Sequence, residues 1–327
     1  MSVLSVVVPV RDVEPYVDTT LDSLARNIAT AADAGHRVEV VVVDDGSVDG
    51  TGQRVADALP RLPGAVVLRN DVPRGLGAAR NQGAALASGR WLAFLDGDDW
   101  LTPHHLRDVA DALDALRCDF VRVDHVRVQG RTRSLRRAPE GRRGVVLDPR
   151  SAVLPTWADT MVDYPYAWAG AYDARLRDEG LLHFPEHLRT AEDRPFVWRL
   201  HLRARSFAVL ASVGVCYRRG VPTSLTQVGD ERQLHFLDAY ELVLQDVAAD
   251  PDAEALLPKA AAQLVAIVLH QVAHEQRLAP VAQAELRRRG VDALLALPYG
   301  LLPQTQRQLA PHRAAALAAL VTGRTAA

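Results

Sequence analysis

The chain has 327 residues, a formal net charge of −2, and a composition that is 48% hydrophobic and 24% charged, which is ordinary for a soluble globular protein. A near-neutral charge excludes nucleic-acid binding through a strong basic field. The two cysteines, Cys118 and Cys216, lie far apart without metal-ligand spacing, so we expect neither a disulfide framework nor a zinc site, and we expect a reducing cytoplasm.

Buried strands alternate with helices over roughly the first 120 residues. The β-branched run at 4–10 is typical of a strand buried on both faces, and similar runs follow at 37–47, 65–70 and 90–96. Helical patterns lie between and after them, at 13–34, 50–59, 75–88 and 103–117. Thr102 and Pro103 suit the N-cap and first turn of the last helix. The alternation predicts an α/β fold with a mostly parallel sheet and helices on both faces.

The rest of the chain predicts a looser middle region and a helical end. We expect strands at 119–130 and 206–219 with a helix at 191–204 between them, and Ala- and Leu-rich helices from about 231 onward. This gives a domain at 1–226 and a helical extension at 227–327. The extension is expected to pack on the domain or to pair protomers, with contact to the acceptor polymer or to a membrane surface as alternatives.

No membrane-spanning segment or signal peptide is predicted. The chain has no uncharged apolar stretch of about 18 residues, and its first residues lack a basic region and a cleavage site.

Acidic residues follow three of the predicted strands. Val10-Arg11-Asp12, Asp44-Asp45-Gly46 and Asp96-Gly97-Asp98 all stand at carboxyl ends, which meet at one edge of a parallel sheet and form its ligand-binding side. Asp96, Asp98 and Asp99 repel one another unless a positive group lies among them. We expect the three strand ends to converge.

The acids have two interpretations each. Asp96 and Asp98 suit a hard divalent cation, Mg²⁺ or Mn²⁺, or they form a solvated turn in which Asp99 caps the next helix. Asp44 and Asp45 suit a nucleobase or ribose, or a turn capped by Ser47 or Asp49. The glycine fingerprints of Rossmann dehydrogenases and P-loop enzymes do not follow the first strand.

Four blocks of sequence, in order, resemble the family 2 glycosyltransferases, which have the GT-A fold. The resemblance covers 3–110, reappears at 188–230 and is absent from the last ~100 residues. The blocks are VVVPVRDVEPYVDTTLDSL, VVVVDDGSVDGT, RGLGAARNQGAALASGRWLAFLDGDDWLTP and AEDRPFVWRL.

The resemblance implies roles for individual residues. The family's metal motif maps onto Asp96-Gly97-Asp98, with Asp98 as the direct ligand of Mn²⁺ or Mg²⁺. Its catalytic base maps onto Asp193 of the Glu192-Asp193 pair, although Asp193 also suits an ordinary acid at a helix N-terminus. A loop at 217–226 resembles the one that folds over the donor diphosphate, through Arg218 and Ser224. The nucleotide pocket maps onto Pro9, Val10, Glu14, Asp44, Asp45 and Arg80. The sequence PVRD departs from the family's usual motif, so contacts from Arg11 and Asp12 are not carried over.

These features together predict a metal-dependent inverting glycosyltransferase, cytoplasmic or peripheral at the inner face of the membrane. We expect a nucleoside diphosphate sugar as donor, a UDP-sugar by preference, and a cell-envelope glycopolymer or lipid-linked glycan as acceptor. The alternatives are transfer to a small natural-product acceptor, or a catalytically silent protein that binds sugar nucleotides or organises a complex.

Two further features can be explained by structure alone, without a role in binding. The Arg-rich segment 127–143 is expected to be a solvated, mobile loop, ahead of a site for an anionic acceptor. The aromatic residues suit an acceptor platform or the core, and they are Trp157, Tyr164, Tyr166 and Trp168.

Overall fold

The β-branched runs form one nine-stranded sheet in the computed structural model, which describes residues 3–221 and 228–325. The strand order is β3-β2-β1-β4-β8-β6-β9-β5, and β7 pairs with β6 at the side. The strands are β1 (Val3–Val10), β2 (Arg37–Asp44), β3 (Val66–Arg69), β4 (Trp91–Phe94), β5 (Trp100–Leu101), β6 (Phe120–Gln129), β7 (Thr132–Arg136), β8 (Gly170–Asp173) and β9 (Phe207–Arg218).

The predicted α/β sheet is confirmed, with three antiparallel strands added to it. β3, β2, β1, β4, β6 and β9 point in one direction, so their carboxyl ends share an edge. The short strand β8 is inserted antiparallel between β4 and β6, and β5 and β7 are antiparallel to their neighbours as well.

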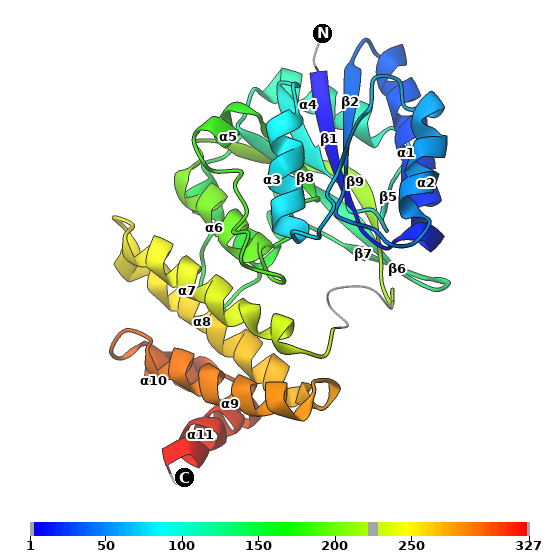
Figure 1. Cartoon of the computed structure of the whole chain (residues 1–327). Helices are drawn as coiled ribbons and strands as arrows, with labels where there is room; N and C mark the ends of the chain where they lie inside the picture. Colours follow the sequence, from blue (N-terminus) through cyan, green and yellow to red (C-terminus); the bar gives the residue numbers. More distant parts are fainter. Residues whose placement is uncertain (1–2, 222–227, 326–327) are drawn as a thin grey trace.

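Helices cover both faces of this sheet (Figure 1). α1 contacts α2 and α4 on one face, whereas α3 packs against β1 and β2 on the other. The helices of the sheet region are α1 (Glu14–Asp33), α2 (Thr51–Ala58), α3 (Leu76–Leu86), α4 (His105–Leu116), α5 (Arg175–Asp178) and α6 (Asp193–Arg203).

The predicted start of α4 is wrong. The helix begins at His105 after His104, which has a left-handed φ of 65°. The hydroxyl of Thr102 donates instead to the carbonyl oxygen of Val213 in β9, at 2.5 Å. A tertiary partner therefore replaces the expected cap.

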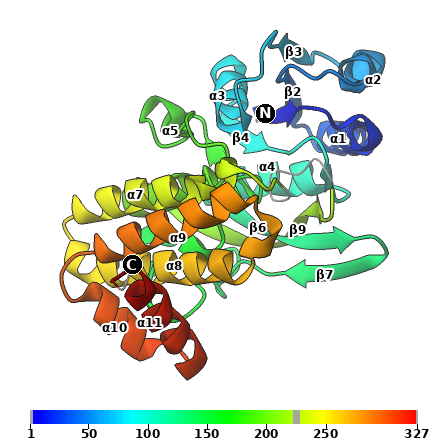
Figure 2. The same cartoon turned by 60° about the horizontal axis from the view of Figure 1, so that its bottom comes forward.

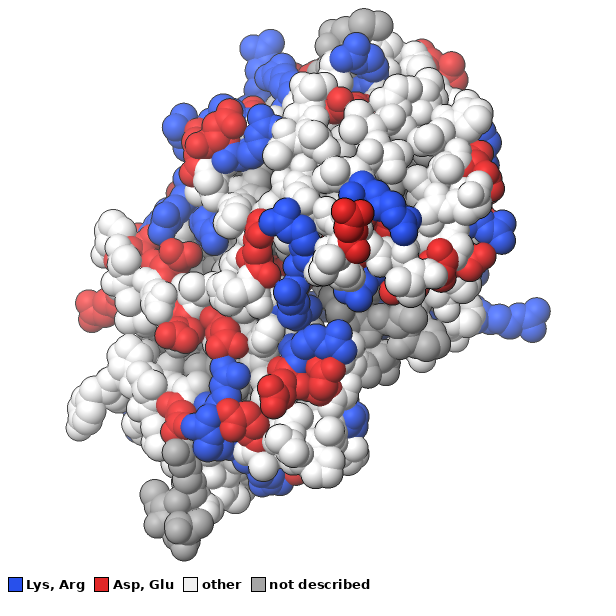
Figure 3. Space-filling view, in the orientation of Figure 1, with Lys and Arg blue, Asp and Glu red and all other residues white. Residues whose placement is uncertain are grey.

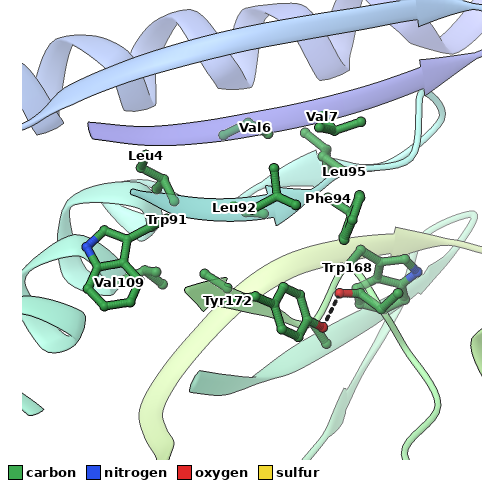
Figure 4. Close-up of a cluster of buried hydrophobic side chains, with 14 of the residues drawn as sticks. Leu4, Val6, Val7, Trp91, Leu92, Phe94, Leu95, Val109, Trp168 and Tyr172 are labelled. Carbon is green, nitrogen blue, oxygen red and sulfur yellow. Dashed lines mark hydrogen bonds between the residues drawn. The ribbon is translucent and has the colours of Figure 1, made fainter. Parts of the chain in front are cut away.

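The core lies between β1, β4, β8 and the flanking helices (Figure 4). Leu4, Val6 and Val7 of β1 lie beside Trp91, Leu92 and Phe94 of β4, and all are at most 1% exposed. This continuous apolar packing fixes the parallel register of β1 and β4, and the register sets where the two strands end.

The Arg-rich segment 127–143 is only in part the loop that its composition predicted, because 127–129 and 132–136 are strand whereas 137–142 are irregular. Residues 120–129 and 132–136 form the β6–β7 hairpin, in which Arg127 is opposite Ser134 and His125 is opposite Arg136. Backbone pairing with β6 therefore orders a sequence too polar to signal a strand.

The end of the chain is helical, as predicted, and Figure 2 shows these helices grouped beside the sheet region. A second apolar cluster joins them to that region, because Trp198 and Leu202 of α6 pack with residues of the last helices. The helices are α7 (His235–Ala248), α8 (Ala253–Ala273), α9 (Pro280–Leu295), α10 (Leu301–Gln308) and α11 (Pro311–Thr325). The boundary at 226 falls in 222–227, outside the described residues, so the two-domain division stays a prediction.

Among the described residues, α8 is the one helix long and apolar enough to cross a membrane. Its most apolar window is 56% buried in the structure, and it packs against α7, α9 and α10. The apolar sequence of α8 also contains two buried polar residues, Lys259 and Gln263.

Candidate active site

The three acidic strand ends meet, as predicted. The carbonyl oxygen of Val10 accepts a hydrogen bond from the amide of Asp45 at 2.9 Å. Gly97 lies against the same strand end, since a Cβ there would stand 2.7 Å from Val10 Cγ1 and 3.1 Å from the Pro9 oxygen. This approach requires glycine, and it brings the 96–98 motif beside β1.

The carboxylates of Asp44 and Asp45 organise the loops of this edge. Asp44 accepts from Arg69 Nη1 at 2.6 Å and from the Ser47 amide at 2.9 Å. Asp45 accepts from the amides of Arg74 and Gly75, at 2.7 and 2.8 Å, just before α3. Their contact with a nucleotide stays a prediction. Arg69 was missed, because an exposed arginine on an edge strand carries no sequence signal of its partner.

Neighbouring turns are braced in the same way. Glu14 Oε2 accepts from the amide of Gly50 at 3.0 Å, and Asp12 Oδ1 accepts from that of Val48 at 2.9 Å. Asp49 accepts from the Thr51 amide at the start of α2, but the N-cap of that helix is Gly50, not Ser47 or Asp49. The loops above β1 and β2 are therefore locked together by carboxylates.

Arg218 and the carboxyl of Asp99 form a buried link from β9 to the motif. Arg218 donates its amide to Asp99 Oδ1 at 2.7 Å and its Nε to the Asp98 carbonyl at 2.8 Å. Its guanidinium also lies over the rings of Trp100 and Tyr16, at 4.7 and 5.0 Å. Asp99 is thus no helix cap, which corrects that interpretation. The predicted partner Ser224 lies outside the described residues.

Thr20 was also missed by the sequence analysis. Its hydroxyl lies within hydrogen-bond distance of the carbonyl oxygens of Gly97 and Asp99, at 2.9 and 2.6 Å. The buried face of α1 carries Ser23 and Asn27 as well, so nothing in the sequence marked Thr20 as the residue that would meet these carbonyls.

Arg80 supplies a positive charge for the acidic motif. Its side chain is 3% exposed, and it donates Nη2 to Asp96 Oδ1 and Nη1 to Glu192 Oε1, both at 2.7 Å. Burial opposes the charge, but Asp96 and Glu192 together raise the pKa of Arg80. One guanidinium therefore joins the 96–98 motif to the start of α6. Direct contact between Arg80 and a nucleotide stays a prediction.

Asp193, which is half-buried, begins α6 just after a strained turn. Burial, followed by the charge of Glu192, raises the pKa of Asp193 well above its ordinary value. Ala191, just before the pair, has a left-handed φ of 61°, a conformation that a non-glycine residue adopts at some energetic expense. A carboxyl that holds its proton near neutrality suits general base chemistry.

Asp96 and Asp98 suit a divalent cation. Burial and the charge of Asp96 raise the pKa of Asp98 to about 6, so a cation at this carboxyl would be stabilising, and hard cations prefer such oxygen ligands. Among the described residues no group of three or more acids, histidines or cysteines is placed to hold a metal. Substrate phosphates and water would have to complete the coordination.

The four aromatic residues proposed for an acceptor platform or for the core differ in their exposure to solvent. Tyr164 and Trp168 are buried, and Tyr164 shares a hydrogen bond with His125 Nδ1 at 2.5 Å, as expected of core residues. Tyr166 is half-buried and contacts Trp168 at 4.9 Å between ring centroids. Trp157 is 48% exposed.

Comparison with known proteins connects this geometry to a family. Residues 5–168, about half of the chain, match the family model described as Glycosyl transferase family 2. The uncharacterized glycosyltransferase EpsJ of Bacillus subtilis is 26% identical over 69% of this chain and 63% of its own. The poly(ribitol-phosphate) β-N-acetylglucosaminyltransferase TarS of Staphylococcus aureus is 29% identical over 74% of this chain and 39% of its own. The chain thus spans less than two thirds of these relatives.

Solved structures agree on the fold. Residues 1–349 of S. aureus TarS, in complex with UDP-GlcNAc, superpose with a TM-score of 0.73 at 21% identity, covering 100% of this chain and 92% of that one. The mannosyltransferase PcManGT of Pyrobaculum calidifontis, with GDP-Man and Mn²⁺, gives 0.53 at 21% identity, covering 98% and 86%. The predicted resemblance and the GT-A fold are confirmed.

Proposed function

The chain belongs to glycosyl transferase family 2, and from that premise we propose that it is an inverting glycosyltransferase. The donor is a nucleoside diphosphate sugar, a UDP-sugar by preference, since TarS matches over the whole chain with UDP-GlcNAc bound. The acceptor is a hydroxyl of a cell-envelope glycopolymer or of a lipid-linked glycan, and the reaction takes place on the cytoplasmic side.

One observation supports the proposal above the others. Arg80 connects the metal motif at Asp96 to Glu192, and Asp193 follows directly on α6. A donor site and a candidate base are thus held by one buried side chain, as a single-displacement reaction requires, since reacting groups must be positioned together.

Asp98, with Asp96, would hold Mn²⁺ or Mg²⁺. Such an ion, when bound, offsets the negative charge that develops on the diphosphate leaving group. PcManGT was solved with Mn²⁺, which favours this assignment.

Asp193 is assigned the role of base. Its carboxylate takes the proton of the acceptor hydroxyl while the oxygen forms a bond to the anomeric carbon. The bond from that carbon to the diphosphate breaks on the opposite side, so the configuration at the anomeric carbon inverts, as it does in inverting glycosidases. Glu192 is held by Arg80 at 2.7 Å, which leaves Asp193 as the carboxylate free to act.

Calorimetric titration of UDP tests the donor assignment. We expect binding with Mn²⁺ that weakens with EDTA and is lost in Asp98→Ala. The control Asp57→Asn, an exposed acid of α2 that pairs with Gln53, leaves binding unchanged. If neither UDP nor any other nucleoside diphosphate binds the wild type, the proposal fails. Binding of a different nucleotide overturns only the uracil.

A further inference from the structure

The β6–β7 hairpin carries positive charge that nearby acids compensate only in part. Residues 127–137 contain five arginines and no acid. Arg136 pairs with Asp159 at 3.0 Å, whereas Arg127 and Arg131 have no carboxylate partner in the part of the chain that the structure describes. Figure 3 shows basic side chains projecting where the hairpin lies in Figure 1. Isolated exposed charges of this kind are available to an anionic ligand.

Aromatic rings lie on one face at the base of this hairpin. Arg127 is opposite Tyr217 in the β6–β9 ladder, and paired residues point to the same side of a sheet. Tyr166 packs on that side, 4.6 Å from His125 and 6.1 Å from Tyr217 between ring centroids.

Two arginines form hydrogen bonds with the hydroxyl groups of these rings. Arg127 donates to the Tyr166 hydroxyl at 2.8 Å, and Arg219 donates to the Tyr217 hydroxyl at 2.7 Å. Tyr166 and Tyr217 are half-buried, and Arg127 and Arg219 are exposed. The surface thus offers ring area and guanidinium groups together.

This arginine–tyrosine surface lies between the two halves of the site. Tyr217 precedes Arg218, whose amide and Nε bind Asp99 and the Asp98 carbonyl. The side chains of these two neighbours point to opposite faces of β9, but burial and the nearby charge of Asp99 both raise the pKa of the Tyr217 hydroxyl. On the other flank, Arg194 follows Asp193, and although burial opposes its charge, Tyr240, Asp193 and Tyr166 lie close enough to raise the pKa of Arg194. A molecule bound on Tyr166 and Tyr217 would therefore lie beside the residues that flank the metal motif and the candidate base.

We propose that Arg127, Arg131, Arg219, Tyr166 and Tyr217 bind an acceptor that carries phosphodiester groups along its length. Guanidinium groups bind phosphate through paired, charge-assisted hydrogen bonds, and tyrosine rings cover the apolar faces of a polyol or sugar. The inference rests on the proposed function, because it names the acceptor class of that site.

An anionic membrane surface is the main rival occupant. A membrane-binding hairpin needs several large apolar residues beside its basic ones. In β7 only Leu135 is an exposed large apolar residue, which is too little apolar surface to insert into a membrane. The tyrosines lie at the base of the hairpin, beside the site. The polymer is therefore favoured, and vesicle binding becomes an outcome of the test.

The test uses the double variant Arg127→Gln/Arg219→Gln in the full chain. The probe is fluorescently labelled oligo(ribitol phosphate), followed by anisotropy, with a labelled neutral maltooligosaccharide of equal length as reference. The wild type is expected to bind the anionic probe, more weakly as salt rises. The double variant should lose about tenfold in affinity for each arginine removed.

The control is Arg26→Gln/Arg307→Gln, which removes two exposed arginines of α1 and α10 and should bind like the wild type. Equal binding of both probes by the wild type overturns the inference, as does an unchanged double variant. Sedimentation with phosphatidylglycerol vesicles that depends on Arg127 and Arg219, without polymer binding, overturns it too.

Titration of UDP separates this inference from the proposed function. Equal UDP affinity in the wild type and the double variant is expected. A lower affinity in the double variant would assign these arginines to the donor and overturn the inference. Failure of the wild type to bind any nucleoside diphosphate, with polymer binding intact, contradicts the proposed function alone.

Discussion

Arg80 is the residue on which the acidic groups of the site depend. Replacing it in Arg80→Met leaves Asp96 and buried Glu192 without their cation. Removing one partner of a buried ion pair typically lowers the free energy of unfolding by about 3–5 kcal/mol, and urea denaturation should show a loss of that order. Arg80→Lys should fall in between, since an ammonium lacks the fork that joins two carboxylates.

The matched control for Arg80 is Arg61→Met. Arg61 forms an ion pair with Asp22 at the surface, where both side chains are about half exposed. Exposed pairs contribute less than about 1 kcal/mol. Equal losses of unfolding free energy in the two methionine variants would show that the buried ion pairs stabilise the protein no more than an exposed pair does.

Asp193 should give the transfer reaction a distinctive pH dependence. Burial and Glu192 raise its pKa, and a general base acts only when unprotonated. We expect kcat/KM to rise with pH through that raised pKa and then to level off, in assays between about pH 5 and pH 9. Asp193→Asn should lose this limb and lower kcat by about 10²- to 10⁴-fold. A wild-type rate that is flat from about pH 5 upward would exclude this role.

Stability provides an independent check on the same carboxyl. A pKa raised in the folded state means that the native protein holds the proton more tightly than the unfolded chain does. The contribution of Asp193 to wild-type stability should therefore fall as pH rises from the unfolded value, about 4, through the folded one. Asp193→Asn cannot lose a proton, so its stability relative to the wild type should increase over that window.

The sequence located the acids of the site but not all of their partners. Strand periodicity and the position of Asp44, Asp96 and Asp98 after apolar runs were enough to predict their convergence. Arg69 and Thr20 could not be predicted, because their roles depend on which loops the fold brings together across distant parts of the chain.

At the scale of elements, the contact of α3 with β1 depends on glycine. A Cβ at Gly83 would lie 2.3 Å from Val7 Cγ1. Overpacking costs about 1–3 kcal/mol, more than the roughly 1 kcal/mol that alanine gains over glycine in a helix. Gly83→Ala is therefore expected to lower the melting temperature.

The same substitution at Gly323 in α11 should have the opposite sign. A Cβ there meets nothing within 4 Å, so Gly323→Ala should stabilise by up to about 1 kcal/mol through helix propensity alone. If both variants were stabilised to a similar degree, α3 would have to sit further from β1 than the structure places it.

The sequence pattern predicted the long elements and the short strands β3 and β4, but it missed β5, β7 and β8. Residues 3–10 and 14–33 carry clear strand and helix patterns. β5 has two residues, β8 has four, and the polar, arginine-bearing β7 shows no apolar face. These strands exist because neighbouring strands offer unpaired backbone groups, and that information is not local.

At the scale of the whole molecule, Lys259 ties the C-terminal helices to the sheet region. It is the only lysine of the chain, and its Nζ, buried in α8, donates to Asp163 Oδ2 at 2.6 Å and to the Ala158 carbonyl at 2.8 Å. Gln263 of α8 donates to Asp163 Oδ1 at 2.7 Å and accepts from Trp198 Nε1 at 2.8 Å. Trp198 lies on α6, the helix that begins with Asp193.

This network predicts that the chain unfolds as one unit. The apolar cluster around Trp198 draws on both predicted domains, so neither part keeps its core when the other unfolds. Scanning calorimetry should show a single transition.

Lys259→Met, which leaves Asp163 without its cation, should lower the stability by about 3–5 kcal/mol and move the transition without splitting it. Glu254→Gln, in the exposed first turn of α8, should change it by less than about 0.5 kcal/mol. Two separate transitions, only one of them shifted by Lys259→Met, would instead support independent domains, because a shared core couples every part of the structure to the loss of this contact.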